Sequence, residues 1–399
     1  MATLSLVWLL CTLLLSFCVG SSRFFVSNQF ALEPQFPHID SERIVHAVTG
    51  NVDENNLLDA IVFYATSVDM SKSKDFREQD YEHSITFHHM VIYDIRSGPR
   101  IWQGPHGFYP FKSTGYSEPQ PSFTMEHDVN TRSCYGSGTH NRYYRDWPEA
   151  QAFVAIDLND NGKLDVVVVS ATGYCHKDHC EPPRTLVGEI LRRRCTNARH
   201  RGHINIKTWL LMDIQPDGRF SKVVEGSSFV SNTTSIGARS LRVGVSASVE
   251  QHSACSNSHL LTVIQGQTRA QLCLDLDGNV SPSHSLPLLQ LVNMHDVNYY
   301  STSTALKMNG DWWYLLVNRG GEWMLWLDSH NWYNGNFNIP NSASIAVAAV
   351  DFDDDGVDDV ILIDCPSTRN RCRLWHGTFY SSEFNDYDVH NDDFFNELL

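Results

Sequence analysis

Short apolar runs bounded by turn-forming residues recur along this chain of 399 residues. The runs are rich in β-branched and aromatic residues, as in "HMVIYDI", "HINIKTWLLMDI", "HLLTVI", "WWYLLVN" and "EWMLWLD". Gly, Asn, Asp and Pro separate them, as in Pro216-Asp217-Gly218 and Asn309-Gly310. Helical periodicity is scarce. Many short strands at this spacing predict an all-β fold, which means a sandwich, a barrel or a propeller.

Three acidic stretches repeat one pattern within this series of strands. They are "NVDENNLLDAIVF" from Asn51, "DLNDNGKLDVVVV" from Asp157 and "DFDDDGVDDVILI" from Asp351. Each follows an apolar lead, has acidic or amide residues at its first, third and fifth positions, and has an aspartate at its ninth. Each then continues into an apolar run that predicts a strand. The repeat predicts an array of similar units.

The spacing of the three stretches gives an expected number of units. Their first residues are separated by 157 − 51 = 106 and 351 − 157 = 194 residues. These separations fit two and four units of roughly 50 residues, a length typical of propeller blades. Residues 44–399 would then hold seven blades, and six longer blades fit nearly as well. We therefore predict a β-propeller of four-stranded blades, with seven blades favoured over six.

The acidic stretches have the residue types of a calcium loop. Alternate residues can turn oxygen atoms inward, and a glycine at the sixth position permits a sharp bend. The expected ligands in the last loop are Asp351, Asp353, Asp355, the carbonyl of Val357, and Asp359. In the second loop they are Asp157, Asn159, Asn161, the carbonyl of Lys163, and Asp165. In the first loop they are Asn51, Asp53, Asn55 and Asp59, with Asn56 in place of the glycine.

The chemistry of these ligands favours Ca²⁺ over Mg²⁺, because an all-oxygen shell of this flexibility suits the larger ion. An EF-hand is excluded, since its twelfth position would fall at Leu362, Val168 or Val62, each inside an apolar run. Counting carboxylates, we expect the loop at Asp351 to bind most tightly and the loop at Asn51 least tightly. The alternative is that the polar side chains only cap backbone groups of ordinary turns.

These loops resemble the FG-GAP or VCBS-type repeats of β-propellers such as the head of the integrin alpha subunit. "DLNDNGKLDVVVV" and "DFDDDGVDDVILI" match the motif well, and the stretch at Asn51 matches less closely. The resemblance implies four-stranded blades, calcium in outer hairpin loops, and a role in adhesion or recognition. The phenylalanine-glycine and glycine-alanine-proline signatures of the family are not evident.

The N-terminus predicts a secreted protein. Residues 4–19 are mostly apolar and lead to Gly20, so residues 1–20 read as a cleaved signal peptide. Residues 21–43 could close the ring by pairing with the last blade, or could be a linker. Residues 44–382 would form the propeller, and residues 383–399 an acidic C-terminal segment. No later apolar stretch is long enough to cross a bilayer.

Cysteine usage agrees with an oxidising compartment. Ten cysteines become eight once Cys11 and Cys18 leave with the signal peptide. The suggested disulfides pair Cys175 with Cys180, Cys365 with Cys372, Cys255 with Cys273 and, by elimination, Cys134 with Cys195. Spacing does not fix this connectivity. Asn232-Thr233-Thr234 is a glycosylation sequon at Asn232.

Charge and motifs narrow the function. The formal net charge of −16 disfavours a nucleic-acid partner. The chain contains neither a G-x-S-x-G nucleophile elbow nor an H-E-x-x-H zinc motif. We therefore expect a non-catalytic recognition or adhesion protein with a protein or matrix ligand. A lectin-like propeller and a polysaccharide lyase or hydrolase are the alternatives.

A late cluster of tryptophans bears on these alternatives, because exposed indoles stack on sugar rings. The cluster comprises Trp312, Trp313, Trp323, Trp326 and Trp332. We expect most of them to lie in the core of a blade. Alternation along "EWMLWLD" places Trp323 and Trp326 on opposite faces of a strand, which predicts that at least one of the two is exposed.

Overall fold

The structure of the chain is a computed structural model. It describes residues 23–31, 42–66 (without 54 and 56), 82–95, 115–128 (without 119), 151–175, 185–186, 189–190, 202–233, 245–291 (without 256–257, 266–267, 284 and 287–288), 302–337 (without 309, 319 and 328–331), 342–351, 356–366 and 373–380. All described regular elements are β-strands.

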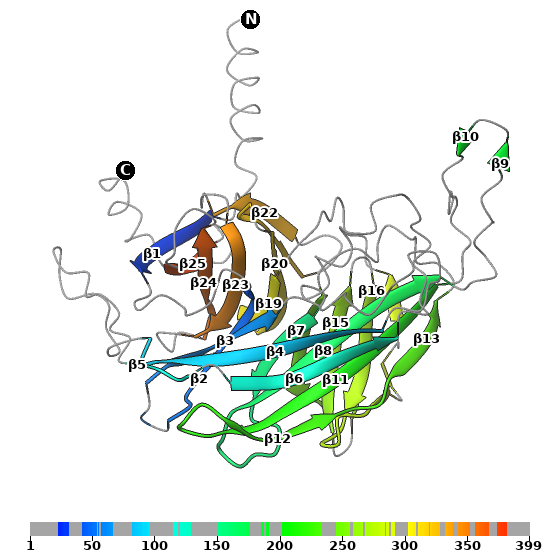
Figure 1. Cartoon of the computed structure of the whole chain (residues 1–399), viewed down its shortest axis with the longest axis horizontal. Helices are drawn as coiled ribbons and strands as arrows, with labels where there is room; N and C mark the ends of the chain where they lie inside the picture. The colour runs from blue at the N-terminus through cyan, green and yellow to red at the C-terminus, as the bar shows by residue number, and fades with distance from the viewer. Residues whose placement is uncertain are drawn as a thin grey trace, which may run out of the picture.

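Five antiparallel sheets form the blades of a propeller (Figure 1). Blade 1 holds β2 (Glu42–Gly50), β3 (Asp59–Thr66), β4 (Glu82–Tyr93), β5 (Gly115–Tyr116) and β6 (Gln120–Asp128). Blade 2 holds β7 (Gln151–Ile156), β8 (Asp165–Cys175), β11 (Gly202–Ile214), β12 (Phe220–Glu225) and β13 (Phe229–Thr233). Blade 3 holds β14 (Val245–Gln251), β15 (His259–Gln265), β16 (Thr268–Leu274), β17 (Val280–Pro282) and β18 (Leu289–Leu291).

The last two blades are shorter. Blade 4 holds β19 (Thr302–Met308), β20 (Asp311–Val317), β21 (Glu322–Trp326) and β22 (Trp332–Asn336). Blade 5 holds β23 (Ser342–Val350), β24 (Asp359–Pro366), β25 (Arg373–Tyr380) and β1 (Arg23–Ala31). A separate two-stranded hairpin joins β9 (Thr185–Leu186) to β10 (Glu189–Ile190).

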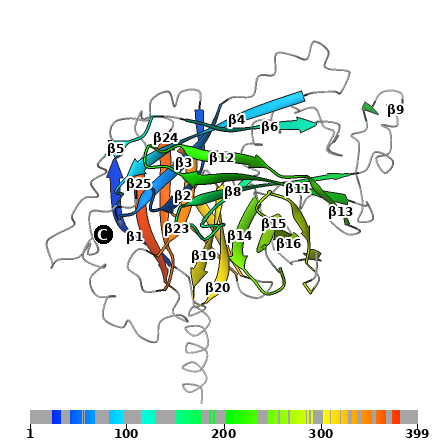
Figure 2. The ribbon, with the colours of Figure 1, turned by 90° about the horizontal axis from the view of Figure 1, so that it is seen from below.

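The first strands of the five blades line the middle of the ring. β2 contacts β23 and β7, β14 contacts β7 and β19, and β19 contacts β23. This series returns to its start, so the five blades form a closed ring in chain order. Figure 2 shows β14 of blade 3 beside β19 of blade 4.

The expectation of seven blades, or six, is therefore wrong. The separation of 106 residues between the first two acidic loops spans one blade rather than two, and the separation of 194 spans three rather than four. The reason lies in the length of the first two blades. From the start of one first strand to the start of the next, blade 1 takes 151 − 42 = 109 residues and blade 2 takes 245 − 151 = 94, whereas blade 3 takes 302 − 245 = 57. In blades 1, 2 and 3 the fourth strand is also divided into two segments that pair along the same third strand, as β12 and β13 do along β11.

The two ends of the described chain meet in blade 5. β1 pairs antiparallel with β25, with Arg23 opposite Tyr380 and Ala31 opposite Arg373. Figure 1 shows β1 at the outer side of β25. The N-terminal strand therefore covers the edge of the last sheet, where unpaired backbone groups would otherwise lie open.

One apolar cluster fills each of the five interfaces between blades. For example, Val167 of blade 2 packs with Val245 of blade 3, and Ala60 of blade 1 packs with Ile361 of blade 5. Both faces of a blade are therefore covered, which explains why Val166, Val167, Val168 and Val169 are all fully buried.

The same packing buries the tryptophans of blade 4. Trp323 faces blade 5 and meets the ring of Phe379 at 4.8 Å. Trp326 faces blade 3 and shares a cluster with Ile264. Both are at most 2% exposed, so the prediction that one of them is exposed is wrong. Trp313 is also buried, and Trp312, which is partly buried, donates its indole N–H to Glu250. The side chain of Trp332 lies outside the described residues.

In the part of the chain that the structure describes, no helix has the length and apolar character that a bilayer span requires.

Candidate functional site: three acidic loops at one face of the ring

The three acidic loops occupy equivalent places in the fold. Each joins the first strand of a blade to the second: β2 to β3, β7 to β8, and β23 to β24. The loops belong to blades 1, 2 and 5, which are consecutive in the ring. Because the first strands run side by side around the axis, the three loops lie at the same face of the propeller.

The first loop is closed by the carboxylate of Asp59, which is fully buried at the start of β3. Its Oδ2 accepts the N–H of Val52 at 2.7 Å, and its Oδ1 accepts the N–H of Asp94 at 2.9 Å. Asn55 donates from its side-chain amide to Asp53 at 3.0 Å and to Asp94 at 2.8 Å. Asp94 follows β4, so the loop is joined to the third strand of its own blade.

The second loop repeats these contacts. The buried carboxylate of Asp165 accepts the N–H of Leu158 at 2.9 Å and the N–H of Asp213 at 2.6 Å. The amide of Asn161 donates to Asp213 at 2.6 Å, and that of Asn159 lies 3.5 Å from the same oxygen.

The first residue of the second loop holds its bend. Asp157 accepts the N–H of Asn161 at 3.1 Å and the N–H of Gly162 at 2.7 Å. Gly162 has a φ of 81°, which justifies glycine at the sixth position of the motif. The amide N–H of Lys163 is satisfied by Asn161 at 2.9 Å.

The third loop shares the bend and differs at its closing residue. Gly356 has a φ of 84° and donates its N–H to Asp351 at 2.9 Å, as Gly162 does to Asp157. Asp359 opens β24, and its Oδ2 lies 3.3 Å from Nε2 of His376 on β25. Val357 is partly buried at the interface of blades 4 and 5. Asp353 and Asp355 lie outside the described residues.

Two aspartates that the sequence motif does not contain complete the first two loops. Asp94 directly follows β4 and Asp213 is the last residue but one of β11, so both lie at the end of the third strand of a blade, and each has a φ of 49°. The following residue, Ile95 or Ile214, donates its N–H to Leu58 or Leu164. In the sequence, both residues belong to an Asp-Ile pair that follows an apolar run, "VIYDI" and "LLMDI", and this shared pattern could have indicated them.

Blade 5 has no aspartate at this place. Its register pairs Val360 with Gly377, so two residues further along Asp358 stands opposite Phe379. In blade 1 Ala60 pairs with Ile92, so two residues further along Leu58 stands opposite Asp94. Phe379 therefore takes the position of Asp94, and its ring packs in the core.

Burial and like charge act on the closing carboxylates. Burial raises the pKa of Asp59, and the neighbouring carboxylates of Asp53 and Asp94 raise it further, while the N–H donors of Asp94 and Val52 oppose the shift. Burial likewise raises the pKa of Asp165. By contrast, the side-chain hydrogen bond from Asn161 is the largest influence on Asp213, and it lowers the pKa of this carboxyl together with weaker hydrogen bonds from Ser221 and Asn159. An opposite charge at the first two loops would relieve the repulsion.

The first loop also meets a geometric requirement for a single cation. One carboxylate oxygen from each of Asp53, Asp59 and Asp94 lies within 4.8 Å of the other two. Oxygen ligands at roughly 2.3–2.6 Å from Ca²⁺ are at most about 5 Å apart. These three residues therefore fit a hard dication. In the residues that the structure describes, this is the one such convergence of acidic, His or Cys side chains.

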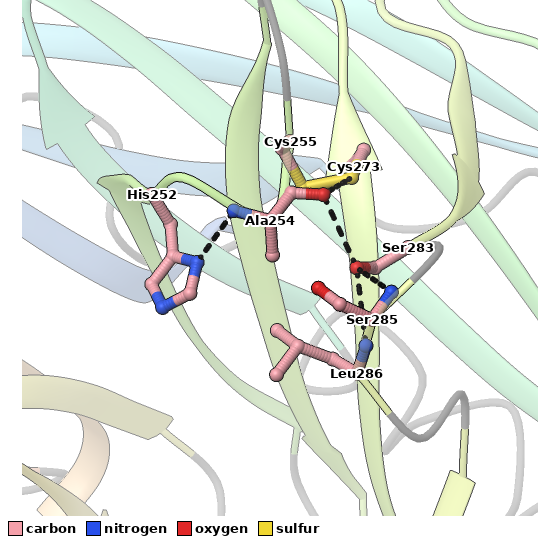
Figure 3. The surroundings of a disulfide bond; sticks show 7 residues. All are labelled: His252, Ala254, Cys255, Cys273, Ser283, Ser285 and Leu286. Atoms are coloured by element: carbon pink, nitrogen blue, oxygen red, sulfur yellow. Dashed lines mark hydrogen bonds between the residues drawn. A yellow bond between two sulfur atoms is a disulfide. The ribbon is translucent and has the colours of Figure 1, made fainter.

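Blades 3 and 4 use other devices at the same place. In blade 3 the loop from β14 to β15 contains Cys255, which forms a disulfide with Cys273 on the third strand (Figure 3). Ala254, next to it, accepts a hydrogen bond from Ser283 at 3.3 Å. In blade 4 a short turn through Gly310, with a φ of 87°, joins β19 to β20.

The remaining predicted covalent sites are only partly described. Cys365 is buried and disulfide-bonded, while its suggested partner Cys372 lies outside the described residues. Cys175 ends β8, and Asn232 lies in β13 opposite His203. Cys134, Cys180, Cys195 and residues 1–20 also lie outside the described part.

Comparisons with known proteins add little to this geometry. A scan against protein-family models finds no match, and a search of curated proteins finds none either. Among solved structures, NanB sialidase from Streptococcus pneumoniae matches with a TM-score of 0.34 and 9% identity over 86% of this chain and 60% of that one. Trypanosoma rangeli sialidase matches with a TM-score of 0.31 and 11% identity over 88% and 60%. The chain thus spans about 60% of each sialidase. Likenesses this weak carry no argument about function.

Proposed function

We propose that this chain is a secreted, calcium-binding β-propeller that recognises an extracellular protein or matrix ligand without catalysis. The observation that carries the calcium part is the convergence of Asp53, Asp59 and Asp94 around one possible cation position. The matching contacts of Asp165 and Asp213 in the next blade support a second site of the same kind.

The residues that would hold calcium come from two parts of each blade. In blade 1 they are Asn51, Asp53, Asn55, Asp59 and Asp94; in blade 2 they are Asp157, Asn159, Asn161, Lys163 through its carbonyl, Asp165 and Asp213. In blade 5 they are Asp351, Asp353, Asp355, Val357 through its carbonyl, and Asp359. Bound calcium would offset the repulsion among these carboxylates. With Asp94 and Asp213 included, the first two loops have three carboxylates each, which brings them closer to the four of the last loop.

The proposed role of calcium is structural, because the loops also contact neighbouring blades. Asp358 exchanges two hydrogen bonds with Lys307 of blade 4, at 2.6 and 2.9 Å. Gln251 of blade 3 donates to Asp160 of blade 2 at 3.2 Å. Ordering a loop therefore also orders an interface between blades. Aspartates that a cation keeps ionised are poor candidates for general acid–base chemistry, which supports recognition rather than turnover.

The calcium part is tested by calorimetry and thermal unfolding of the purified mature chain. After chelator has been removed, titration with CaCl₂ should release heat, and excess EDTA should lower the melting temperature. Titration with MgCl₂ is the matched control and should give a much weaker response. No calcium heat, together with an unchanged melting temperature in EDTA, would show that the loops are ordinary turns.

The recognition part needs a separate experiment. Pull-down from an extracellular extract, in calcium and again in chelator, should enrich a protein ligand only in calcium. A glycan array and turnover assays on polysaccharides test the two alternatives with the same preparation. Binding on the array, or cleavage of a polysaccharide, with no calcium-dependent protein partner would replace the proposal with a carbohydrate function.

A further inference from the structure

A tight turn of blade 2 lies against the outer strands of blade 1. Residues 215–219 join β11 to β12, and we call them the latch turn. Two internal hydrogen bonds hold its shape: Gln215 donates its N–H to the carbonyl of Arg219 at 2.7 Å, and Gly218 donates to the carbonyl of Gln215 at 2.8 Å. Because these bonds lie within the turn, it can leave blade 1 without losing its own shape.

Two side chains of blade 1 hold the latch turn in place. Nε2 of His89 on β4 lies 2.6 Å from the carbonyl oxygen of Gly218, and the hydroxyl of Tyr93 donates to the carbonyl of Pro216 at 2.8 Å. The backbone also approaches closely, since a Cβ added to Gly218 would lie 2.9 Å from the Cβ of Ser117. The latch turn therefore supplies acceptors, and blade 1 supplies the donors.

The hydrogen bonds of His89 determine where its proton lies. A carbonyl oxygen can only accept, so Nε2 carries the proton, and Nδ1 of the neutral ring is an acceptor. The hydroxyl of Ser122 on β6 donates to this Nδ1 at 2.6 Å. The imidazole is 1% exposed, and its centroid lies 4.8 Å from that of Phe220, the first residue of β12. A second proton would have to enter at Nδ1, on the side that Ser122 occupies.

The surroundings of His89 disfavour a second proton. Burial is the largest influence and lowers the pKa of His89 from 6.5 to about 4, and the neighbouring His88 lowers it further. On the latch turn, Asp217 and Arg219 are exposed and face each other, with Nε of Arg219 3.6 Å from Oδ2 of Asp217. The neighbours from the other strands, which are uncharged at physiological pH, are Phe63, Ser122 and Tyr93.

We propose that His89 and the latch turn form an acid-sensitive latch between blades 1 and 2. A second proton on His89 favours the state in which the turn has left blade 1 and water reaches the imidazole. Opening exposes the apolar surface that Val91 and Phe220 share in the closed state. The contacts of the latch use none of the proposed calcium ligands, so this inference is independent of the calcium proposal.

Linkage gives the size and the sign of the effect. In the open state the imidazole is solvated and its pKa returns to 6.5, whereas in the closed state it is about 4. Between these values only the open state binds the second proton. The ratio of open to closed molecules should therefore be about 30-fold higher at pH 5 than at pH 8. Acid opens the latch, and neutral pH closes it.

The test measures how often a side chain beneath the latch turn becomes accessible. Val91 is fully buried on β4, and its Cγ2 would lie 3.2 Å from a Cβ added to Gly218. In the mature chain in saturating calcium, mass spectrometry follows the labelling of Val91→Cys by a pyridyl disulfide reagent. The rate is divided by that of free cysteine at the same pH, and it should be about 30-fold higher at pH 5 than at pH 8.

A matched variant separates the latch from general loosening of the fold. Val263→Cys makes the same change at a buried valine of β15, in the interface between blades 2 and 3. Its corrected labelling rate should not rise in acid. An equal rise at both cysteines would show that the whole propeller opens, and a rate at Val91→Cys that does not change with pH would show that no latch opens. Either result would overturn the proposal.

Two further variants test the residues of the latch in the Val91→Cys background. His89→Gln can make the same two hydrogen bonds but takes up no proton, so its labelling rate should be equal at both pH values. An acid rise that persists in this variant would overturn the proposal. Should His89→Gln fail to fold, Tyr93→Phe removes the bond to Pro216 and should raise labelling about fivefold at both pH values. No rise in Tyr93→Phe would show that the turn is not held there.

Discussion

The substitution Asp165→Asn separates a calcium ligand from a residue that merely caps a turn. Asp165 is fully buried at the start of β8, and its two oxygens accept N–H groups from Leu158 at 2.9 Å and from Asp213 at 2.6 Å. Asparagine preserves the shape of this side chain. It removes the charge and turns one of the two acceptors into a donor, which must then face a backbone N–H.

The expected cost differs with and without calcium. In chelator the variant loses one hydrogen bond to a charged acceptor, about 1.5–3 kcal/mol. Part of that loss is offset, because burial and the carboxylates of Asp213 and Asp157 raise the pKa of Asp165 and so disfavour its charge. We expect a net cost of about 1–2 kcal/mol. At a hundredfold excess of calcium over its Kd, the wild type gains a further 2.7 kcal/mol, approximately, which the variant loses with its site. The total cost in calcium is then about 4 kcal/mol.

The assay is urea unfolding of both chains in saturating calcium and in EDTA. Asp217→Asn is the matched control, since Asp217 is exposed and caps the N–H of Arg219 at 3.0 Å in an ordinary turn. Its small effect should be equal in the two conditions. An equal cost of Asp165→Asn in calcium and in EDTA would refute the reasoning and leave the loop as a self-capped turn.

Three further predictions address pH, covalent linkage and packing. Burial lowers the pKa of His89 from 6.5 to about 4, so between these pH values the unfolded chain binds a proton at this residue and the folded chain does not. The free energy of unfolding should therefore fall by up to ~3 kcal/mol as the pH drops from 6.5 to 4. Urea unfolding at several pH values measures this fall, which should be smaller in His89→Gln. Replacing Cys255 and Cys273 together by alanine should cost about 3 kcal/mol, equally in calcium and EDTA, and a calcium-dependent cost would contradict a purely covalent tether. In Gly226→Ala the added Cβ would collide with the backbone carbonyl of Gly278 in the next blade. The substitution should therefore lower the free energy of unfolding by about 3 kcal/mol. An unchanged melting temperature would show that blades 2 and 3 are not in close contact at this point.

Local features of the fold could be predicted from the sequence. Asp59, Asp165 and Asp359 each begin a strand, as the ninth position of the motif predicts. These positions follow from alternation and turn chemistry over a dozen residues, where local preference and the final structure agree. The all-β class and the four-stranded blades rest on the same kind of signal.

Features that depend on distant pairing could not be predicted. Asp94 reaches Asp59 from 35 residues away, and Asp213 reaches Asp165 from 48, through strand registers that no local motif encodes. The predicted blade count was wrong because it assumed units of equal length, whereas the first strands of blades 1 and 2 begin 109 and 94 residues before the next (151 − 42 and 245 − 151). The prediction that Trp323 or Trp326 is exposed was wrong because alternation predicts an exposed side chain only in a sheet with a solvent-facing side. Both faces of this blade pack against neighbouring blades.

The blades differ in one structural link. In blades 1, 2 and 3 the loop after the first strand lies at the face of the ring and is linked to the third strand, whereas a short turn takes its place in blade 4. Blades 1 and 2 make this link with Asp94 and Asp213, which bind the closing carboxylate through their backbone N–H groups. Blade 3 makes it with the disulfide from Cys255 to Cys273. A disulfide needs no cation, so blade 3 has this link without an acidic loop. In blades 1 and 2 the link depends on buried carboxylates, whose mutual repulsion the proposed calcium would offset.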